Sequence, residues 1–237
     1  MWLRLSSCAL IGIDSMMNRA LVQSNEGVTL IGNGSVPPRV LADALALAPR
    51  LVAADGGADR ALALRHVPEA VIGDLDSLSE TGRDRLPGSG VHRIEEQETS
   101  DFDKALRSIA APFVLAIGFS GSRLDHTLSM FNVLARHPDR RCLALGAEDL
   151  CFVAPRDLTL NLSPGTRLSL LPMGAVSGRS SGLHWPIDGI DFAPGGMTGL
   201  SNRVSAPEVR MTFCAPRMLV FLPLAALEPA IAALAAE

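Results

Sequence analysis

Short apolar runs alternate with longer helix-like stretches through the first part of the chain. The runs predict strands at Val28–Ile31, Leu51–Ala54, Ala70–Ile72, Val91–Ile94, Phe113–Ile117 and Cys142–Leu145. The stretches between them predict helices at Pro38–Ala48, Ala58–Arg65, Ser79–Leu86, Asp101–Ala110 and Asp125–Arg136. Because strands that alternate with helices of this length build parallel sheets, residues 28–147 are predicted to form an α/β domain with a mostly parallel, Rossmann-like sheet.

The pattern changes after about Glu148, where short strand-like pieces are separated by Pro and Gly. The predicted strands are Phe152–Val153, Leu158–Leu162, Arg167–Leu171, Val209–Phe213 and Met218–Leu222. A helix is expected only in the Ala-rich tail from about Ala225. Strands of this kind are typical of all-β domains, so residues 148–237 are predicted to be a second, all-β domain.

The first 27 residues fit neither pattern. Trp2–Ile13 is apolar and faintly resembles a signal peptide, but Asp14 interrupts the run and no small-residue cleavage site follows. The run is also too short to span a bilayer. We therefore expect residues 1–27 to be a loose extension, with Met16 or Met17 as an alternative start. No other stretch approaches transmembrane length, so the protein is expected to be cytoplasmic, with no membrane partner.

Composition narrows the functional classes. Apolar residues make up 48% and charged residues 19% of the chain, which suits a packed core and excludes a disordered protein. The net charge of −4 provides no attraction to nucleic acid or to anionic membranes. The four cysteines are scattered and form no CxxC pair, which argues against a zinc site or a disulfide framework.

Acidic residues follow four of the predicted strands. Their positions are Asp55, then Asp74 and Asp76, then Asp101 and finally Asp125. Ligands of parallel sheets bind beyond the carboxyl ends of the strands, so these side chains are expected at one edge. Crowded carboxylates repel one another unless a cation compensates, and Mg²⁺ prefers hard oxygen ligands. A single DxD is more often a turn, but acids at several strand ends predict a magnesium site.

Two glycine-rich segments are candidates for phosphate contact. Gly56-Gly57 stands before a helix, where a tight turn is the alternative interpretation. The loop from Gly118 ends in Arg123, which would neutralise phosphate charge or would pair with an aspartate. Lys104 would reach a phosphate or pair with Asp101 on its own helix. These features predict a Mg²⁺-dependent enzyme that transfers a phosphate-containing group from a nucleotide.

The motifs in order resemble the thiamine pyrophosphokinase family over roughly residues 28–222. The matching segments are Asp55-Gly56-Gly57-Ala58, Gly73-Asp74-Leu75-Asp76-Ser77, Ser100-Asp101-Phe102-Asp103-Lys104-Ala105, Gly121-Ser122-Arg123-Leu124-Asp125-His126, Gly182-Leu183-His184-Trp185-Pro186-Ile187 and Gly199-Leu200-Ser201-Asn202. The resemblance implies an α/β nucleotide domain, a C-terminal β-sandwich that binds thiamine, and a homodimer whose active site lies between the two kinds of domain. The implied reaction converts ATP and thiamine into AMP and thiamine diphosphate.

The resemblance also implies roles for individual residues. Asp74, Asp76 and Asp101 would hold Mg²⁺ on the triphosphate of ATP. Asp55 and Asp125 would lie close by, and either would assist deprotonation of the thiamine hydroxyl. Gln97 and Arg123 would contact phosphate, and Gly56, Gly57, Ser100 and Lys104 remain further candidates for nucleotide contact. Trp185 would offer its face to the thiazolium cation, with Ser201 and Asn202 around the pyrimidine.

Several positions depart from the family pattern. Ser100 stands for the usual Thr, Gln97-Glu98 for a common Lys-Asp pair, Ser122 for a Gly, and Trp185 for a frequent Tyr. None removes a required functional group, but they leave the fine substrate preference open. The nearest alternative is a diphosphotransferase that acts on a hydroxymethylpterin with the same metal site. A non-catalytic nucleotide- or thiamine-binding regulator and a phosphohydrolase with Asp74 as nucleophile explain fewer of these residues.

Overall fold

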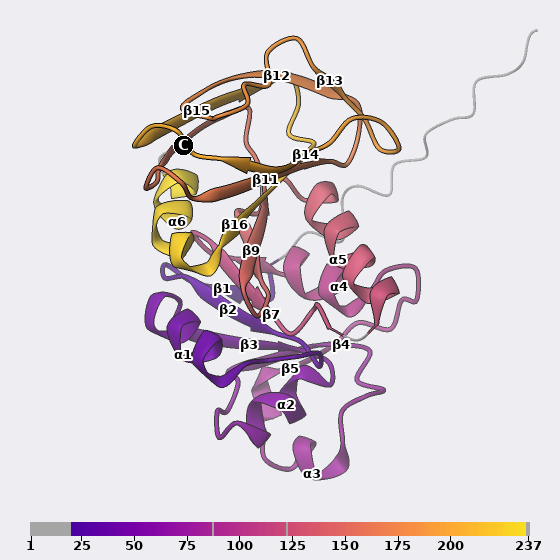
Figure 1. The fold of residues 1–237 in the computed structure, drawn as a ribbon. Coiled ribbons are helices and arrows are strands. Elements are labelled where there is room, and N and C mark those ends of the chain that lie inside the picture. Colours follow the sequence, from indigo (N-terminus) through magenta and orange to yellow (C-terminus); the bar gives the residue numbers. More distant parts are fainter. Residues whose placement is uncertain (1–19, 87, 122, 236–237) are drawn as a thin grey trace, which may run out of the picture.

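A ten-stranded mixed sheet is the main element of the computed structural model, which describes residues 20–86, 88–121 and 123–235 (Figure 1). Its strands in spatial order are β14 (Gly199–Arg203), β11 (Arg167–Pro172), β16 (Met218–Pro223), β9 (Asp149–Val153), β8 (Cys142–Leu145), β7 (Val114–Ile117), β2 (Val28–Ile31), β3 (Arg50–Ala54), β4 (Ala70–Gly73) and β5 (Val91–Arg93). The strands from β8 to β5 are parallel, and those from β9 to β14 pair antiparallel.

Helices cover both faces of the parallel part of the sheet. The side chains of β2 alternate between two apolar clusters, with Ile31 on one face and Leu30 on the other. Helices α1 (Pro38–Leu47), α2 (Gly57–Ala63) and α6 (Leu227–Ala235) contribute to the first cluster, and α4 (Asp101–Arg107) and α5 (Leu124–Arg136) to the second. Strands buried on both faces are continuous apolar runs, which is why their positions were readable from sequence.

A four-stranded antiparallel sheet packs over the other end of the large sheet. It contains β10 (Asp157–Asn161), β15 (Glu208–Phe213), β12 (Val176–Ser181) and β13 (Asp191–Phe192). In β15, buried Val209, Met211 and Phe213 alternate with exposed residues, as expected for a sheet with one solvated face. The buried side chains join those of β11 and β16 in one apolar cluster, so the two sheets form a sandwich at the top of Figure 1.

The predicted order, an α/β part followed by antiparallel β structure, is confirmed at this coarse level. The sheet itself continues across the predicted boundary at residue 147, because β8 pairs with β9 and Phe152 faces both Leu143 and Val220. The first apolar cluster also contains residues from both parts. The division into domains 28–147 and 148–237 therefore stays a prediction.

Two sequence-based expectations are corrected at the start of the chain and after α4. The predicted helix Asp101–Ala110 ends at Arg107, and Ile109–Ala110 forms strand β6. The expectation of a loose extension is wrong for Val22–Gln23, which forms strand β1 and pairs with β6 in parallel. Residues 1–19, including Met16 and Met17, lie outside the described residues.

The remaining elements are short. Helix α3 (Glu80–Arg83) begins after Ser79, whose Oγ accepts a hydrogen bond from the Gly82 amide at 2.9 Å. Two 3₁₀ turns, Gly88–Gly90 and Leu224–Ala226, precede β5 and α6. Across the described ranges 20–86, 88–121 and 123–235, no helix is long and apolar enough to cross a membrane.

Candidate active site

Three carboxylates meet at the carboxyl edge of the parallel strands. Asp55 follows β3, Asp74 follows β4, and Asp101 is the first residue of α4. One oxygen from each lies within 4.8 Å of the others. Gly73 permits this approach, because a Cβ at that position would stand 2.8 Å from the Asp55 Cβ and 3.3 Å from Asp101 Oδ1. We call Asp55, Asp74 and Asp101 the acidic cluster.

Asp55 is the buried member of the acidic cluster. It is 4% exposed, its Oδ2 accepts a hydrogen bond from the Ser77 amide at 3.3 Å, and its Oδ1 has no hydrogen-bond partner. Burial raises the pKa of Asp55, and the neighbouring Asp101 and Asp74 charges act in the same direction. Its φ of 44° is unusual for a residue with a Cβ, and strain of this kind clusters at functional sites.

The acidic cluster fits a hard divalent cation. Its ligand atoms are carboxylate oxygens, which Mg²⁺ prefers, and Asp55 Oδ1 is a buried acceptor without a hydrogen-bond partner. A cation between these oxygens would satisfy that acceptor and offset the mutual repulsion of the charges. The carboxylates that meet therefore suit a magnesium ion, but the third member of the group is Asp55 and not the predicted ligand Asp76.

Lys104 is the nearest cation to the cluster. Its Nζ donates to Asp74 Oδ2 at 2.9 Å and to Asp101 Oδ1 at 3.1 Å, and the side chain is 1% exposed. Burial by itself lowers the pKa of Lys104, but the hydrogen bonds to Asp74 and Asp101 raise it overall. The hydrogen bond from Lys104 likewise lowers the pKa of Asp74. The intrahelical pair with Asp101 that the sequence allowed is therefore present, together with a second partner.

A loop anchored by Glu96 carries Gln97 and Ser100 to the cluster. Glu96 Oε2 accepts hydrogen bonds from the Glu98 and Thr99 amides at 2.9 and 3.0 Å, and Oε1 accepts one from Arg107 Nη2 at 2.8 Å. Burial opposes ionisation of Glu96, but the hydrogen bonds from Thr99 and the pairing with Arg107 lower its pKa to about 2. Sequence reasoning missed Glu96, since nothing in the local pattern separates it from a solvated acid.

The two predicted site residues on this loop have different partners. Gln97 Nε2 donates to Asp74 Oδ2 at 3.2 Å, which places its amide beside the acidic cluster. Ser100 is the N-cap of α4, where its Oγ accepts a hydrogen bond from the Asp103 amide at 3.4 Å. The hydroxyl of Ser100 thereby helps to set the first turn of the helix that presents Asp101.

The loop that follows strand β2 also borders this edge of the sheet, although sequence reasoning did not single it out. The chain runs from β2 outward through β3, β4 and β5, and then crosses to β7 on the other side of β2. Ligands of open α/β sheets bind at such a reversal of strand order. There the loop 32–35 after β2 meets the loop after β7, and the Gly34 amide donates to the Gly118 carbonyl at 2.7 Å. A Cβ on Gly32 would also stand 2.7 Å from that oxygen.

The glycine pair predicted for phosphate contact lies beside this reversal. A Cβ on Gly57 would stand 2.2 Å from the Ile31 carbonyl oxygen, so α2 approaches β2 in a way that only glycine permits. A Cβ on Gly56 would lie 2.9 Å from the Asn33 amide nitrogen. The Gly56-Gly57 turn therefore lies against the loop after β2, and the residue before it in the sequence, Asp55, belongs to the acidic cluster.

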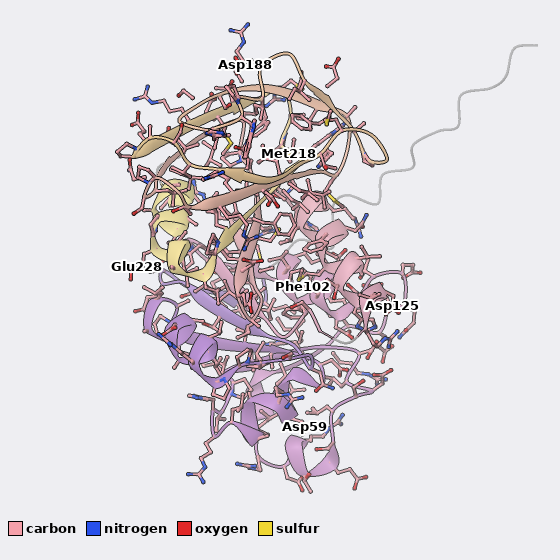
Figure 2. The ribbon with its side chains drawn as sticks, in the orientation of Figure 1. Asp59, Phe102, Asp125, Asp188, Met218 and Glu228 are labelled. Carbon is pink, nitrogen blue, oxygen red and sulfur yellow. The ribbon has the colours of Figure 1, made fainter. Side chains whose placement is uncertain are left out.

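Three predicted residues lie outside the acidic cluster. Asp76 is exposed and accepts a hydrogen bond from Ser77 Oγ at 2.9 Å. Arg123 and Asp125 form an ion pair of 2.5 Å, with both side chains about two-thirds exposed. This pairing lowers the pKa of Asp125. Since β2 separates β7 from β3, the loop after β7 does not bring Asp125 among the other acids, and Figure 2 shows Asp125 at the periphery of the molecule.

In the C-terminal part of the chain, the backbone of Trp185 is hydrogen-bonded to the side chain of Asn202. The Trp185 amide donates to Asn202 Oδ1 at 3.2 Å, and Asn202 Nδ2 donates to the Trp185 carbonyl at 2.7 Å. Asn202 is buried, whereas the Trp185 side chain is 52% exposed. The amide of Asn202 is thus used to position Trp185. Ser201 is exposed with a φ of 58°, and its amide donates to Ser169 Oγ at 2.9 Å.

Within one chain, Trp185 and the acidic cluster are far apart. Asn202, which holds Trp185, belongs to β14, at one end of the large sheet, and Asp74 follows β4 near the other end. Eight strand spacings of about 4.8 Å separate these strands, or roughly 38 Å along the sheet. Figure 1 accordingly places the upper sandwich and the α2–α3 region at opposite ends of the molecule.

Comparison with known proteins links this arrangement to one enzyme family. A family model described as "Thiamin pyrophosphokinase, catalytic domain" matches residues 41–144. "Thiamine pyrophosphokinase 3" of Oryza sativa subsp. japonica is 29% identical over 215 residues, covering 73% of this chain and 80% of the relative. "Thiamine pyrophosphokinase 1" of Arabidopsis thaliana is 30% identical over 190 residues, covering 66% of this chain and 71% of the relative.

Solved structures share the fold. The thiamin pyrophosphokinase of yeast superposes with a TM-score of 0.69 at 17% identity, covering 94% of this chain and 96% of that one. The thiamin pyrophosphokinase of Geobacillus thermodenitrificans superposes with a TM-score of 0.67 at 20% identity, covering 83% and 96%. At these identities the likeness concerns the architecture, and it extends over both parts of the chain.

Proposed function

The chain belongs to the thiamine pyrophosphokinase family, and on that premise we propose that it transfers the pyrophosphate group of ATP to the hydroxyl of thiamine. The products are thiamine diphosphate and AMP. The observation that carries the proposal is the acidic cluster of Asp55, Asp74 and Asp101 with its unpartnered Asp55 Oδ1. A site of this kind suits phosphoryl-type transfer, which depends on positioning and on neutralisation of charge.

Mg²⁺ would supply the main charge neutralisation when bound. Asp74, Asp101 and Asp55 would hold it, and Asp76 would add an oxygen from the solvent side after leaving Ser77. The chain itself supplies the rigid placement of these groups. Gly73 allows Asp55 and Asp101 to approach, and the Glu96 anchor keeps the loop before Asp101 in position.

The nucleotide phosphates would lie between the acidic cluster and the reversal of strand order at β2 and β7. Gly56 and Gly57 allow α2 to pack closely against β2 beside this region, and Gln97 Nε2 stands 3.2 Å from Asp74 Oδ2 at the same edge. Arg123 is exposed beside this region and would turn its guanidinium from Asp125 to a phosphate oxygen. These contacts would orient the β-phosphorus for attack by the thiamine hydroxyl.

A homodimer is part of the proposal. Trp185 stands roughly 38 Å along the sheet from the acidic cluster of its own chain, too far for one thiamine to reach both. A second copy that places its sandwich against the first copy's acidic edge would bring them together. Large apolar side chains are exposed on both candidate surfaces, namely Trp185, Met197 and Leu200 on the sandwich and Leu124 and Leu128 on α5.

A cytoplasmic location also belongs to the proposal. Cys142, Cys151 and Cys214 are free thiols in the structure, and two of them are buried in the large sheet. Unpaired cysteines are typical of proteins that work in reducing compartments. ATP and thiamine would be available to the enzyme there.

The direct test is incubation of the purified protein with thiamine, ATP and Mg²⁺, followed by separation of nucleotides and thiamine species. We expect AMP and thiamine diphosphate in equal amounts. ADP with thiamine monophosphate would keep the metal site but exclude attack on the β-phosphorus. If no thiamine product forms, the hydroxymethylpterin alternative becomes the next substrate class to assay.

Trp185→Ala is expected to raise the KM for thiamine by about tenfold and to leave the KM for ATP nearly unchanged. The reason is the loss of an aromatic face for the thiazolium cation, an interaction of roughly 1–2 kcal/mol in a desolvated site. Steady-state kinetics with each substrate varied in turn would measure both constants. An equal rise in the two constants would show that Trp185 supports the fold and does not contact thiamine.

A further inference from the structure

Lys104 is the only lysine in the 237-residue sequence, and every other Lys or Arg position is an arginine. This single ammonium group is also almost completely buried, at 1% exposure, and it stands at the acidic cluster. A lysine ammonium is a compact point charge with three donors, whereas an arginine fork is planar and larger. The chain therefore uses its one lysine where a small cation must fit between carboxylates.

The ammonium of Lys104 contacts two of the three carboxylates that would hold a metal. Its Nζ lies 2.9 Å from Asp74 Oδ2 and 3.1 Å from Asp101 Oδ1. Asp55 has no cationic partner of this kind: its Oδ2 accepts a hydrogen bond from the Ser77 amide, and its Oδ1 has no hydrogen-bond partner. Lys104 lies in the middle of α4, and its side chain is buried there.

We propose that Lys104 is a built-in cation that competes with a divalent metal for Asp74 and Asp101, and thereby couples metal binding to nucleotide binding. In the free protein the ammonium neutralises part of the acidic cluster and weakens its attraction for a second cation. A nucleotide phosphate offers the ammonium new acceptors, which releases the two carboxylates to the metal. Metal and nucleotide would therefore each bind more tightly in the presence of the other.

The metal part of this inference rests on the acidic cluster alone, and the nucleotide part rests on the proposed function. Mn²⁺ binding, followed by electron paramagnetic resonance without nucleotide or thiamine, tests the metal part by itself. We expect Lys104→Gln to bind Mn²⁺ about tenfold more tightly than the wild-type chain, because a positive charge next to the metal is removed. Arg39→Gln, which removes an exposed charge on α1, is the matched control and should leave the affinity unchanged.

Equal or weaker Mn²⁺ binding by Lys104→Gln would overturn the inference. With a non-hydrolysable ATP analogue present, the gain in Mn²⁺ affinity caused by the analogue should be smaller in Lys104→Gln than in the wild type. An equal gain in both proteins would overturn the coupling. Thiamine diphosphate formation is assayed separately, so loss of the proposed function and loss of this inference give different results.

A second measurement uses the wild-type chain and does not depend on the variant folding. Because Lys104 is the only lysine, selective ¹⁵N-lysine labelling yields one side-chain ammonium resonance. We expect this resonance to shift as Mg²⁺ is added, with the same saturation curve as metal binding. A resonance that stays unchanged at full metal occupancy would show that the ammonium and the metal do not share Asp74 and Asp101.

Discussion

Asp74→Asn is expected to lower kcat for thiamine diphosphate formation by about 10³-fold or more while leaving the fold intact. Asp74 contributes an oxygen to the acidic cluster and pairs with Lys104, so the change removes a charge that metal and ammonium both use. A loss of 10³ corresponds to about 4 kcal/mol of transition-state stabilisation, which is the size expected for losing a metal-ion contribution. Initial rates at saturating Mg²⁺ and ATP measure the effect.

The matched control for this variant is Asp157→Asn, which makes the same change at an exposed position on β10. We expect the control to keep wild-type kcat. Circular dichroism of both variants would establish that the fold is retained. Normal product formation by Asp74→Asn would exclude the acidic cluster as the metal site.

A comparison of Asp55→Asn with Asp76→Asn distinguishes two possible ligand sets. The structure places Asp55 in the acidic cluster and leaves Asp76 exposed beside Ser77. If both residues bind the ion, each variant should raise the Mg²⁺ concentration needed for half-maximal rate. If only Asp55 binds it, Asp76→Asn should need no more Mg²⁺ than the wild type. Titration of activity with Mg²⁺ provides the measurement.

The largest expected change in stability comes from Phe152→Ala. Phe152 is 0% exposed on β9, where it faces Leu143 on one neighbouring strand and Val220 on the other. Removing a buried aromatic ring costs about 3–5 kcal/mol of unfolding free energy, through lost burial and the cavity that remains. Urea unfolding followed by circular dichroism would measure the change, with Val67→Ala, at an exposed position, as the control.

The same experiment tests the division at residue 147. Since the large sheet and its apolar cluster run through both parts of the chain, we expect a single cooperative transition that moves as a whole in Phe152→Ala. Two separate transitions in the wild type, of which the variant shifts only one, would instead support independent domains at 28–147 and 148–237.

The local sequence pattern is sufficient to predict the buried strands, but it is insufficient to predict the polar ones. Strand β2 is a fully buried run, so its bounds follow from its apolar residues. Strands β12 and β14 were not predicted because they are rich in Ser, Gly and Arg and largely solvent-facing. Their pairing partners, β15 and β11, supply the hydrogen bonds that make them strands. Strand β6 is different: Ile109 is buried, and the local pattern extends the preceding helix over Ile109–Ala110 because it cannot show the pairing with β1.

The sequence by itself determined which acids follow which strands, where glycines permit close approach, and the family to which the motifs point. The tertiary structure decided which of those residues meet. Strand order separates Asp125 from Asp55 by placing β2 between β7 and β3, and it carries Trp185 to the far end of the sheet. It also brings Lys104 onto Asp74, thirty residues earlier in the chain. Periodicity reports the environment of a residue along its own element, whereas these encounters depend on long-range pairing between elements.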